Sequence, residues 1–282
     1  MPSTKIFQET ITYQVLNFKD YGNPSSRTRT LVIGVRKDMK EITPFDLYPD
    51  KQPERTLRQV IGHLPSLKKM GEISANDIYH NFRKYSPHME AWIADIKEGQ
   101  SAFDNTDISK IPHTIKNGIV VYNAQKNGDK YTRQCWDKVA PCIHTRNDIM
   151  ASQNTVHPTD NRVFSIRELM LMMSVPSSFV WTDIPFKELN AFSEKQKQDF
   201  LKKEEMNIRQ NLGEAVPTTI FQQIAHKIRT ALCKPTMSEQ DIKSLIGVKS
   251  LTTPSCLLEY IKNADHRSFA DLSKIAELAN AQ

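Results

Sequence analysis

The chain has 282 residues, and only nine of them are glycine. The two nearest glycines, Gly62 and Gly71, lie nine positions apart, so neither G-x-G-x-x-G nor G-x-x-x-x-G-K-[ST] occurs. This spacing excludes a self-sufficient dinucleotide-binding domain and a P-loop NTPase, because both need closely spaced glycines around the phosphates. The formal net charge is +6, and a basic surface attracts polyanions such as nucleic acid.

The length predicts one large domain or two small ones. No segment reaches the roughly 18 consecutive apolar residues of a membrane span, and the N-terminal residues lack the order of a secretion signal. The four cysteines form no C-x-x-C pair, which favours a reduced cytoplasmic setting. No histidine or cysteine group has metal-binding spacing, so we expect no metal site.

The first 38 residues predict two strands. Ile11, Tyr13 and Val15 alternate with polar residues, which is typical of a half-exposed strand. Residues 30–35 are almost continuously apolar and predict a buried strand. A turn over residues 21–24 separates the two, so they can lie side by side in one sheet.

Residues 39–160 are polar and irregular, yet too long and too rich in aromatic side chains to be a linker. Short helices are predicted near residues 57–64 and 88–96. Asn127 and Gly128 lie between two apolar runs, 119–122 and 131–134, and predict the turn of a hairpin.

The last third of the chain predicts helices. Ser165 and Glu168 form a capping box before a methionine-rich stretch that we interpret as core. The charged residues 194–205 predict a solvated helix face, and residues 233–282 predict a helical C-terminal extension. A further amphipathic helix follows Pro217, with an apolar stripe of Ile220, Phe221, Ile224, Ile228, Ala231 and Leu232.

Two places are candidates for chemistry. Arg27 and Arg29 would point to the same side of an extended chain, where two guanidinium groups suit a phosphate or a base edge. The alternative is a solvated strand end. Cys142 lies two positions before His144 and could be a nucleophile if its pKa were depressed. A structural cysteine is the commoner case and is favoured here.

Four segments resemble, in order, the C-terminal half of cytosine-5 DNA methyltransferases. Residues 20–34, DYGNPSSRTRTLVIG, resemble D-Y-G-x-P-Q-x-R-x-R-x-x-x-x-G, and residues 136–143, WDKVAPCI, are similar to W-D-x-P-x-P-T-I. Residues 157–168, HPTDNRVFSIRE, with SVP at 174–176, resemble H-P-x-x-x-R-x-L-[ST]-x-R-E…G-F-P. Residues 209–217, RQNLGEAVP, are similar to R-x-x-G-N-A-V-P. The resemblance covers roughly residues 9–230.

The resemblance implies an α/β fold, with a partial Rossmann-like methyltransferase domain, an irregular mixed α+β target-recognition domain and a helical C-terminal tail. Residues 1–38 would complete the methyltransferase sheet, and residues 39–160 would recognise DNA. Residues 161–232 would return to the methyltransferase domain, and residues 233–282 would extend it.

The family's first half carries the loop for S-adenosylmethionine, the P-C-Q nucleophile and the E-N-V glutamate, and this sequence contains neither P-C-Q nor E-N-V. The resemblance therefore implies one subunit of a split enzyme in a prokaryotic restriction–modification system. That subunit would share S-adenosylmethionine with a partner chain and act on double-stranded DNA.

The family mechanism flips the target cytosine out of the duplex, adds a thiolate to C6 and methylates C5. Arg29 aligns with the arginine that contacts the flipped cytosine, and Arg27 with its structural, phosphate-facing neighbour. Cys142 falls where the family has the threonine of P-T-I, which implies a structural cysteine. The remaining expected contacts are Gln210, Asn211, Glu214 and Ala215 with the cofactor, and Lys126, Lys130, Arg133 and Arg146 with DNA.

Three departures from the family pattern indicate a divergent branch. Ser25 replaces a glutamine, Glu214 replaces an asparagine beside the cofactor, and residues 171–173 replace R-L-Q. The first two favour an alternative, a catalytically silent DNA-binding specificity subunit. A third hypothesis is a truncated pseudogene product, which would aggregate through its bare sheet edge.

Overall fold

The computed structural model describes residues 9–39, 42–124 and 129–233. The predicted helical extension, apart from residue 233, lies outside these residues, as do Lys126 and the predicted turn at 127–128. The chain divides into two compact units, one containing residues 33–47 and the other residues 13–32 and 48–224. These limits differ from the predicted domain boundaries, and the four-part division of the chain stays a prediction.

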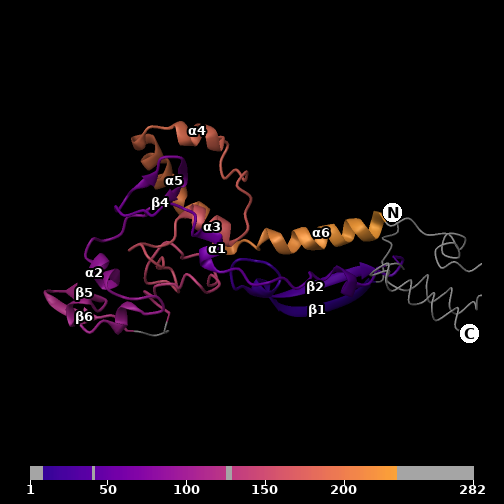
Figure 1. Ribbon diagram of the computed structural model, residues 1–282, viewed down its shortest axis with the longest axis horizontal. Helices are drawn as coiled ribbons and strands as arrows, with labels where there is room; N and C mark the ends of the chain where they lie inside the picture. Colours follow the sequence, from indigo (N-terminus) through magenta and orange to yellow (C-terminus); the bar gives the residue numbers. More distant parts are fainter. Residues whose placement is uncertain (1–8, 40–41, 125–128, 234–282) are drawn as a thin grey trace, which may run out of the picture. The chain divides into compact units, whose positions relative to one another are not determined.

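The described residues form three sheets of two strands each. β1 (Glu9–Asn17) pairs with β2 (Thr28–Arg36), β3 (Ile73–Ser74) with β4 (Asp77–Asn81), and β5 (His113–Lys116) with β6 (Ile119–Tyr122) (Figure 1). The fold is therefore mixed α/β with small sheets. The predicted pairing of the first two strands is confirmed, and the larger Rossmann-like sheet stays a prediction.

Burial on the first sheet differs from the sequence prediction. The apolar side chains of Tyr13 and Val15 in β1 are 72% and 67% exposed, and Val32 in β2 is 61% exposed. Of the strand predicted to be buried throughout, Ile33 and Val35 are buried and their neighbours are not. That prediction is wrong, because successive side chains of a strand point to opposite faces and the described chain covers one of them.

Six α-helices are described: α1 (Leu57–Ile61), α2 (Met89–Ala94), α3 (Ile166–Met172), α4 (Phe186–Ala191), α5 (Glu194–Glu214) and α6 (Thr218–Cys233). Capping boxes begin α1, α3 and α5, where the hydroxyls of Thr56, Ser165 and Ser193 accept the backbone N–H three residues later. The predicted helices around α1, α2, α3, α5 and α6 are confirmed. Four 3-10 turns span Phe18–Asp20, Pro44–Leu47, Ala102–Asp104 and Ile108–Lys110.

The main core of the larger unit surrounds α3. Met170, Met172 and Met173 are fully buried, which confirms the interpretation of this stretch as core. They belong to one hydrophobic cluster with residues of α1, β4, α4 and α5. A second, smaller core centres on Trp92 of α2 and on Tyr131.

The hairpin prediction is wrong in its pairing. β6 pairs with β5 through Asn117 and Gly118, whereas residues 131–134 form no strand. The turn at 117–118 directly joins residues 113–116 to residues 119–122. By contrast, residues 123–126 and 129–130 separate the Asn-Gly at 127–128 from its two flanking runs.

Burial on the two C-terminal helices differs from the sequence prediction. Part of the apolar stripe of α6 is exposed, and part of the charged surface of α5 is buried. In α6, Ile220 and Ile224 are buried, but Phe221 is 50% exposed. In α5, the charged residues Lys197 and Glu205 are buried, so the prediction of a solvated charged face is wrong at these positions. Glu205 is buried because it accepts hydrogen bonds from partners on another element and on its own helix.

Candidate functional site

Arg27 joins three of the four segments that carry the family resemblance. It immediately precedes β2 and is 3% exposed. Its Nη1 donates to the carbonyl of Ile143 and its Nη2 to the carbonyl of Gly213, both at 3.1 Å. Burial lowers the pKa of this guanidinium, and the like charge of Arg29 lowers it further. The start of β2, the loop around residue 143 and the end of α5 are therefore held at one place.

Gly213 allows the end of α5 to approach that loop closely. A Cβ on this residue would lie 2.4 Å from the backbone nitrogen of Thr145 and 2.5 Å from the carbonyl carbon of His144. Backbone atoms cannot move aside as a flexible side chain can. A larger residue at position 213 would therefore separate α5 from the loop.

The third segment reaches the same region through Asn23. The Asn23 amide donates to the carbonyl of Ser25 at 2.7 Å and to its hydroxyl at 2.9 Å, and its Oδ1 accepts from Ser174 at 3.3 Å. The backbone N–H of Ser26 donates to the carbonyl of Ala140. Ser25 is fully buried in this network. The position where the family usually has glutamine is therefore a packing position in this chain.

A buried ion pair begins α3. Glu168 is 1% exposed and accepts hydrogen bonds from both terminal nitrogens of Arg162, at 2.7 and 2.8 Å, and from the backbone N–H of Ser165. Burial by itself would raise the pKa of the Glu168 carboxyl. The charge of Arg162 and its hydrogen bonds outweigh burial and hold that pKa well below its usual range.

His157 lies in the same cluster and is neutral. Its Nδ1 accepts the backbone N–H groups of Thr159 and Asp160 at 3.2 and 3.0 Å, so this nitrogen carries no proton. Burial lowers the pKa of His157 to about 4, although the carboxylates of Glu168 and Asp160 oppose the shift. The cluster fixes the loop before α3, which is a structural role.

Arg29 has quite different surroundings from Arg27. It lies within β2, its side chain is exposed, and its Nη1 donates to the carbonyl of the preceding Thr28 at 2.7 Å. The sequence allows the two arginines either to act as a pair on a phosphate or base edge or to form a solvated strand end. The structure places the Arg27 guanidinium on the protein's own carbonyls and leaves the Arg29 guanidinium at the surface.

Arg133 has a structural role. It is 3% exposed, and its guanidinium donates to the backbone carbonyls of Ile93, Ile96, His157 and Asp160 and to the side chain of Asn161. All three of its nitrogens are occupied by the protein itself. The guanidinium of Arg133 therefore holds the protein's own loops, contrary to the prediction that it contacts DNA.

The other expected DNA contacts are nearer the surface. Lys130 is half-buried, and its carbonyl accepts from the Ser101 hydroxyl at 2.7 Å. Arg146 is exposed and forms an ion pair with Asp148 at 3.0 Å. Lys126 lies outside the described residues.

The four expected cofactor contacts lie together at the end of α5. Gln210, Asn211 and Glu214 are exposed, and Ala215 is half-buried. The Gln210 amide donates to one carboxylate oxygen of Glu214 at 2.9 Å, which leaves the other oxygen to accept from an ammonium group. That these four residues border the amino-acid end of S-adenosylmethionine stays a prediction.

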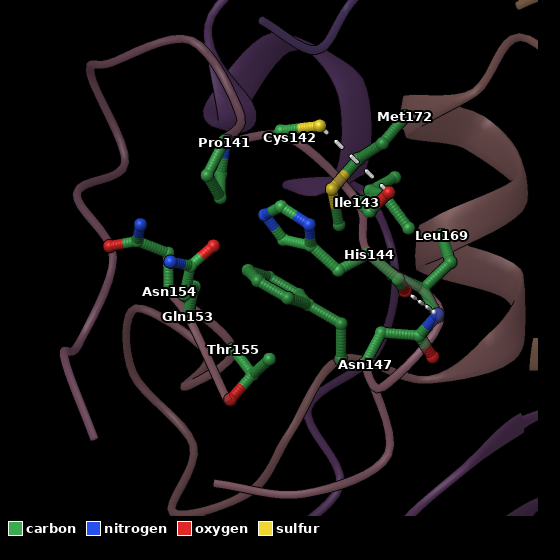
Figure 2. A pocket seen from close by; sticks show the side chains of 11 residues that line it. Pro141, Cys142, Ile143, His144, Asn147, Gln153, Asn154, Thr155, Leu169 and Met172 are labelled. Carbon is green, nitrogen blue, oxygen red and sulfur yellow. Dashed lines mark hydrogen bonds between the residues drawn. The ribbon is translucent and has the colours of Figure 1, made fainter. Parts of the chain in front are cut away.

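Cys142 borders a small cavity with Pro141 and His144 (Figure 2). Its sulfur lies 3.9 Å from Nη1 of Arg27 and 4.0 Å from the carbonyl oxygen of Ile143. Among the described residues no hydrogen bond joins the thiol to the imidazole of His144. The geometry therefore contains no cysteine–histidine pair of the kind that activates a nucleophile.

Two negative findings apply to the described ranges alone. They contain no group of three or more His, Cys, Asp or Glu side chains placed to hold a metal ion. They also contain no helix with the length and apolar character that crossing a membrane requires.

Two residues that hold the site together, Asn23 and Arg209, are not among the residues predicted from the sequence. Arg209 is fully buried, and it donates to Glu205 at 2.9 Å and to the side chain of Asn147 at 3.2 Å. The sequence did contain an indication for Arg209, because it is the first residue of the family-like segment 209–217, which also contains Gly213.

The sequence model of the C-5 cytosine-specific DNA methylase family matches residues 10–230, more than three quarters of the chain. The chain belongs to this family. The matched range of this C-5 cytosine-specific DNA methylase chain includes Arg27, Arg29 and the end of α5.

Similar proteins come from several bacteria. Type II methyltransferase M1.HgaI of Avibacterium volantium is 29% identical over 235 residues, which cover 77% of this chain and 55% of that protein. Type II methylase M.HgiDII of Herpetosiphon aurantiacus is 24% identical, over 79% of this chain and 56% of its own length. Type II methyltransferase M1.HphI of Haemophilus parahaemolyticus is 29% identical, over 76% and 46%. The methylase chain thus spans about half the length of the curated relatives it matches.

Proposed function

We propose that this chain is the DNA-recognition subunit of a split cytosine-5 DNA methyltransferase in the cytoplasm of a prokaryote. With a partner subunit it transfers a methyl group from S-adenosylmethionine to C5 of cytosine in a specific double-stranded sequence. One observation carries the proposal. Arg27 ties three family segments together, while Arg29, two residues later, stays exposed at the start of β2.

In this proposal Arg29 contacts the flipped cytosine. Its guanidinium stabilises negative charge that develops on the ring during methyl transfer. Arg27 is a positioning residue, because it fixes the start of β2 against Ile143 and Gly213.

S-adenosylmethionine, when bound, supplies the methyl group. Gln210, Asn211, Glu214 and Ala215 border its amino-acid end. The second carboxylate oxygen of Glu214 would accept from the ammonium group, in place of the asparagine that the family has at this position.

Residues 39–160 form the target-recognition region of this proposal. Lys126, Lys130 and Arg146 supply positive charge to DNA phosphates, and contacts to phosphates fix register without reading sequence. Arg133 instead holds the loops of this region in place through five hydrogen bonds.

The partner supplies the nucleophile. The 282 residues contain no P-C-Q and no E-N-V, so the cysteine and the glutamate of the family mechanism have to come from outside them. Tyr13, Val15 and Val32 expose apolar surface of the kind that an interacting protein covers. Residues 1–38 and 161–232 would complete the partner's methyltransferase sheet, with 233–282 as an extension.

The test is reconstitution. The purified chain alone should transfer no labelled methyl group to mixed-sequence DNA, whereas the chain co-expressed with a first-half polypeptide carrying P-C-Q and E-N-V should transfer it. A matched pair with the P-C-Q cysteine changed to serine serves as the control. Methyl transfer by the pure single chain would contradict the split enzyme, because the nucleophile would then lie within these residues.

A second candidate is a catalytically silent specificity subunit. The charged Glu214 in place of the family asparagine is the observation that favours it. The buried position of Ser25 removes the other argument for it, since that side chain packs inside the protein. Substitution of Arg29 in the reconstituted pair separates the two candidates.

A further inference from the structure

The hairpin of β5 and β6 is a narrow ribbon. Four cross-strand pairs, from His113–Tyr122 to Lys116–Ile119, join its strands. Asn117 and Gly118 connect them with φ angles of 52° and 77°, as in a two-residue turn of type I′. Within the described residues neither strand pairs with a third one.

Five of the eight strand side chains of this ribbon are apolar and exposed: Ile115, Ile119, Val120, Val121 and Tyr122. All four residues of β6 are exposed, and Ile119 and Ile115 are 68% and 69% exposed. An isolated two-stranded hairpin is marginally stable in water, and an exposed apolar ribbon is a site of association. These side chains are therefore suited to contact another molecule.

The base of the ribbon is anchored. The ring of His113 packs against Trp92 of the smaller core, with ring centres 5.6 Å apart, and against Tyr122 at 6.0 Å. The backbone N–H of Asn123 donates to the carbonyl of Pro112 at 2.9 Å. The base of the hairpin is thus fixed to the smaller core.

The charge around the ribbon indicates what it contacts. Residues 108–128 contain no Asp or Glu, although the chain has 32 acidic residues, and they contain Lys110, Lys116 and Lys126. Lys110 forms an ion pair with Asp95 near the base. Lys116 stands in the cross-strand pair next to the turn. The described residues 108–124, which contain no carboxylate side chain, are complementary in charge to a polyanion.

The shape and side chains match DNA. The major groove of B-DNA admits a two-stranded β-ribbon, and apolar and threonine methyl groups contact the methyl group of thymine. Asparagine side chains hydrogen-bond adenine there, and Asn117 lies at the tip. We propose that the β5–β6 ribbon enters the major groove of the target and determines sequence specificity, with Lys116 on a phosphate. This inference rests on the proposed function.

The first test uses Lys116→Ala in the full chain, with Lys195→Ala as a matched control at an exposed lysine of α5. Binding to a mixed-sequence duplex is measured by fluorescence anisotropy at several salt concentrations. Lys116→Ala should weaken binding about threefold to tenfold at low salt and reduce the slope of log K against log[salt] by about one. Lys195→Ala should change neither quantity.

The second test addresses specificity. Ile119→Thr with Val121→Thr keeps β-branched side chains in the strand and changes the apolar surface. Selection from a library of random duplexes should give a different or weaker sequence motif for this variant than for the unchanged chain. Circular dichroism confirms that the variant is folded.

The outcomes separate this inference from the proposed function. An unchanged salt slope in Lys116→Ala, or an unchanged motif in the double variant, would overturn the ribbon as a reader while leaving the proposed function. A shift in oligomeric state in the double variant with the motif preserved would overturn it in favour of a protein interface. If neither the unchanged chain nor its reconstituted pair with the partner binds DNA at low salt, both proposals fail.

Discussion

A guanidinium N–H of Arg27 donates to the backbone carbonyl of Gly213, 186 positions later in the chain, at 3.1 Å. The same side chain reaches Ile143, so one buried charge joins three distant segments. Because each partner is a backbone carbonyl, the contact depends on the path of the chain and not on the side chains at positions 143 and 213. Changes at Arg27 and at Gly213 should therefore loosen the same place.

Arg27→Ala should destabilise the fold strongly. The substitution leaves two buried carbonyl groups without donors, which costs about 2–4 kcal/mol of unfolding free energy. The measurement is the midpoint of urea unfolding. Arg29→Ala is the matched control, and it should change stability by less than about 0.5 kcal/mol because that side chain is exposed. Equal effects of the two substitutions would contradict the different surroundings of the two arginines.

Gly213→Ala should destabilise the fold through a clash. The added Cβ would lie 2.4 Å from backbone, so α5 and the loop have to separate at a cost of about 1–3 kcal/mol. Thermal unfolding checks this expectation. Gly118→Ala is a useful comparison, because a Cβ there meets nothing within 4 Å and costs only the strain of its positive φ, about 1–2 kcal/mol. In addition, Gly213→Ala should reduce methyl transfer by the reconstituted pair.

Stability should fall as the pH drops from about 6.5 to about 4. The pKa of His157 is lowered from 6.5 to about 4 in the folded state, so the unfolded chain binds a proton first and stability is lost on acidification across this range. The expected loss from this group is on the order of 3 kcal/mol, because each unit of pKa shift corresponds to about 1.4 kcal/mol. The depressed pKa of Glu168 adds a further loss below its ordinary range, in the same direction.

His157→Asn is the control for this pH dependence. The asparagine Oδ1 can replace Nδ1 as the acceptor for the N–H groups of Thr159 and Asp160, and it does not titrate. Urea unfolding between pH 7 and pH 4 should give a flatter profile for the variant. The same slope in both proteins would show that other groups cause the pH dependence.

Arg29→Ala should reduce turnover without removing DNA binding. If its guanidinium stabilises charge on the flipped cytosine, kcat of the reconstituted pair should fall by about 10²–10³-fold. Affinity for the duplex should change by less than about tenfold, since one exposed cation is lost. Unchanged turnover would favour the silent specificity subunit. Arg29→Lys should recover part of the activity, because the charge returns without the planar fork.

Val15→Thr and Val32→Thr should weaken association with the partner subunit. Both side chains are more than half exposed in this chain, so each substitution should change its stability by less than about 0.5 kcal/mol. Titration of one subunit against the other, followed by methyl transfer, measures the effect. Val121→Thr, an equally small change on the exposed hairpin, should leave subunit association unchanged.

Much of the local structure could be predicted because its causes are local. The capping box at Ser165 and Glu168 and the methionine spacing of α3 indicate a helix and its buried face, and both predictions are confirmed. The hairpin at 117–118 could have been recognised as well, since Asn-Gly there joins two β-branched runs directly.

Long-range relations could not be predicted in the same way. Arg27 and Arg29 are the same residue type at alternating positions, and Arg133 and Arg146 differ little by sequence context. Which guanidinium is buried depends on carbonyl groups that the fold brings from residues 93–161 and from Gly213.

The sequence by itself determined the family of this chain and the order of its four segments, because residue identities at fixed spacings are properties of the chain alone. It also excluded a glycine-rich phosphate loop, since that loop needs glycines at fixed short spacings. Only the tertiary structure decided that Arg27 is buried and bonds to distant carbonyl groups, that Arg29 is exposed, and that Arg133 is bonded within the protein. Burial of a charged group depends on the partners that compensate its lost hydration, and those partners lie far away along the chain.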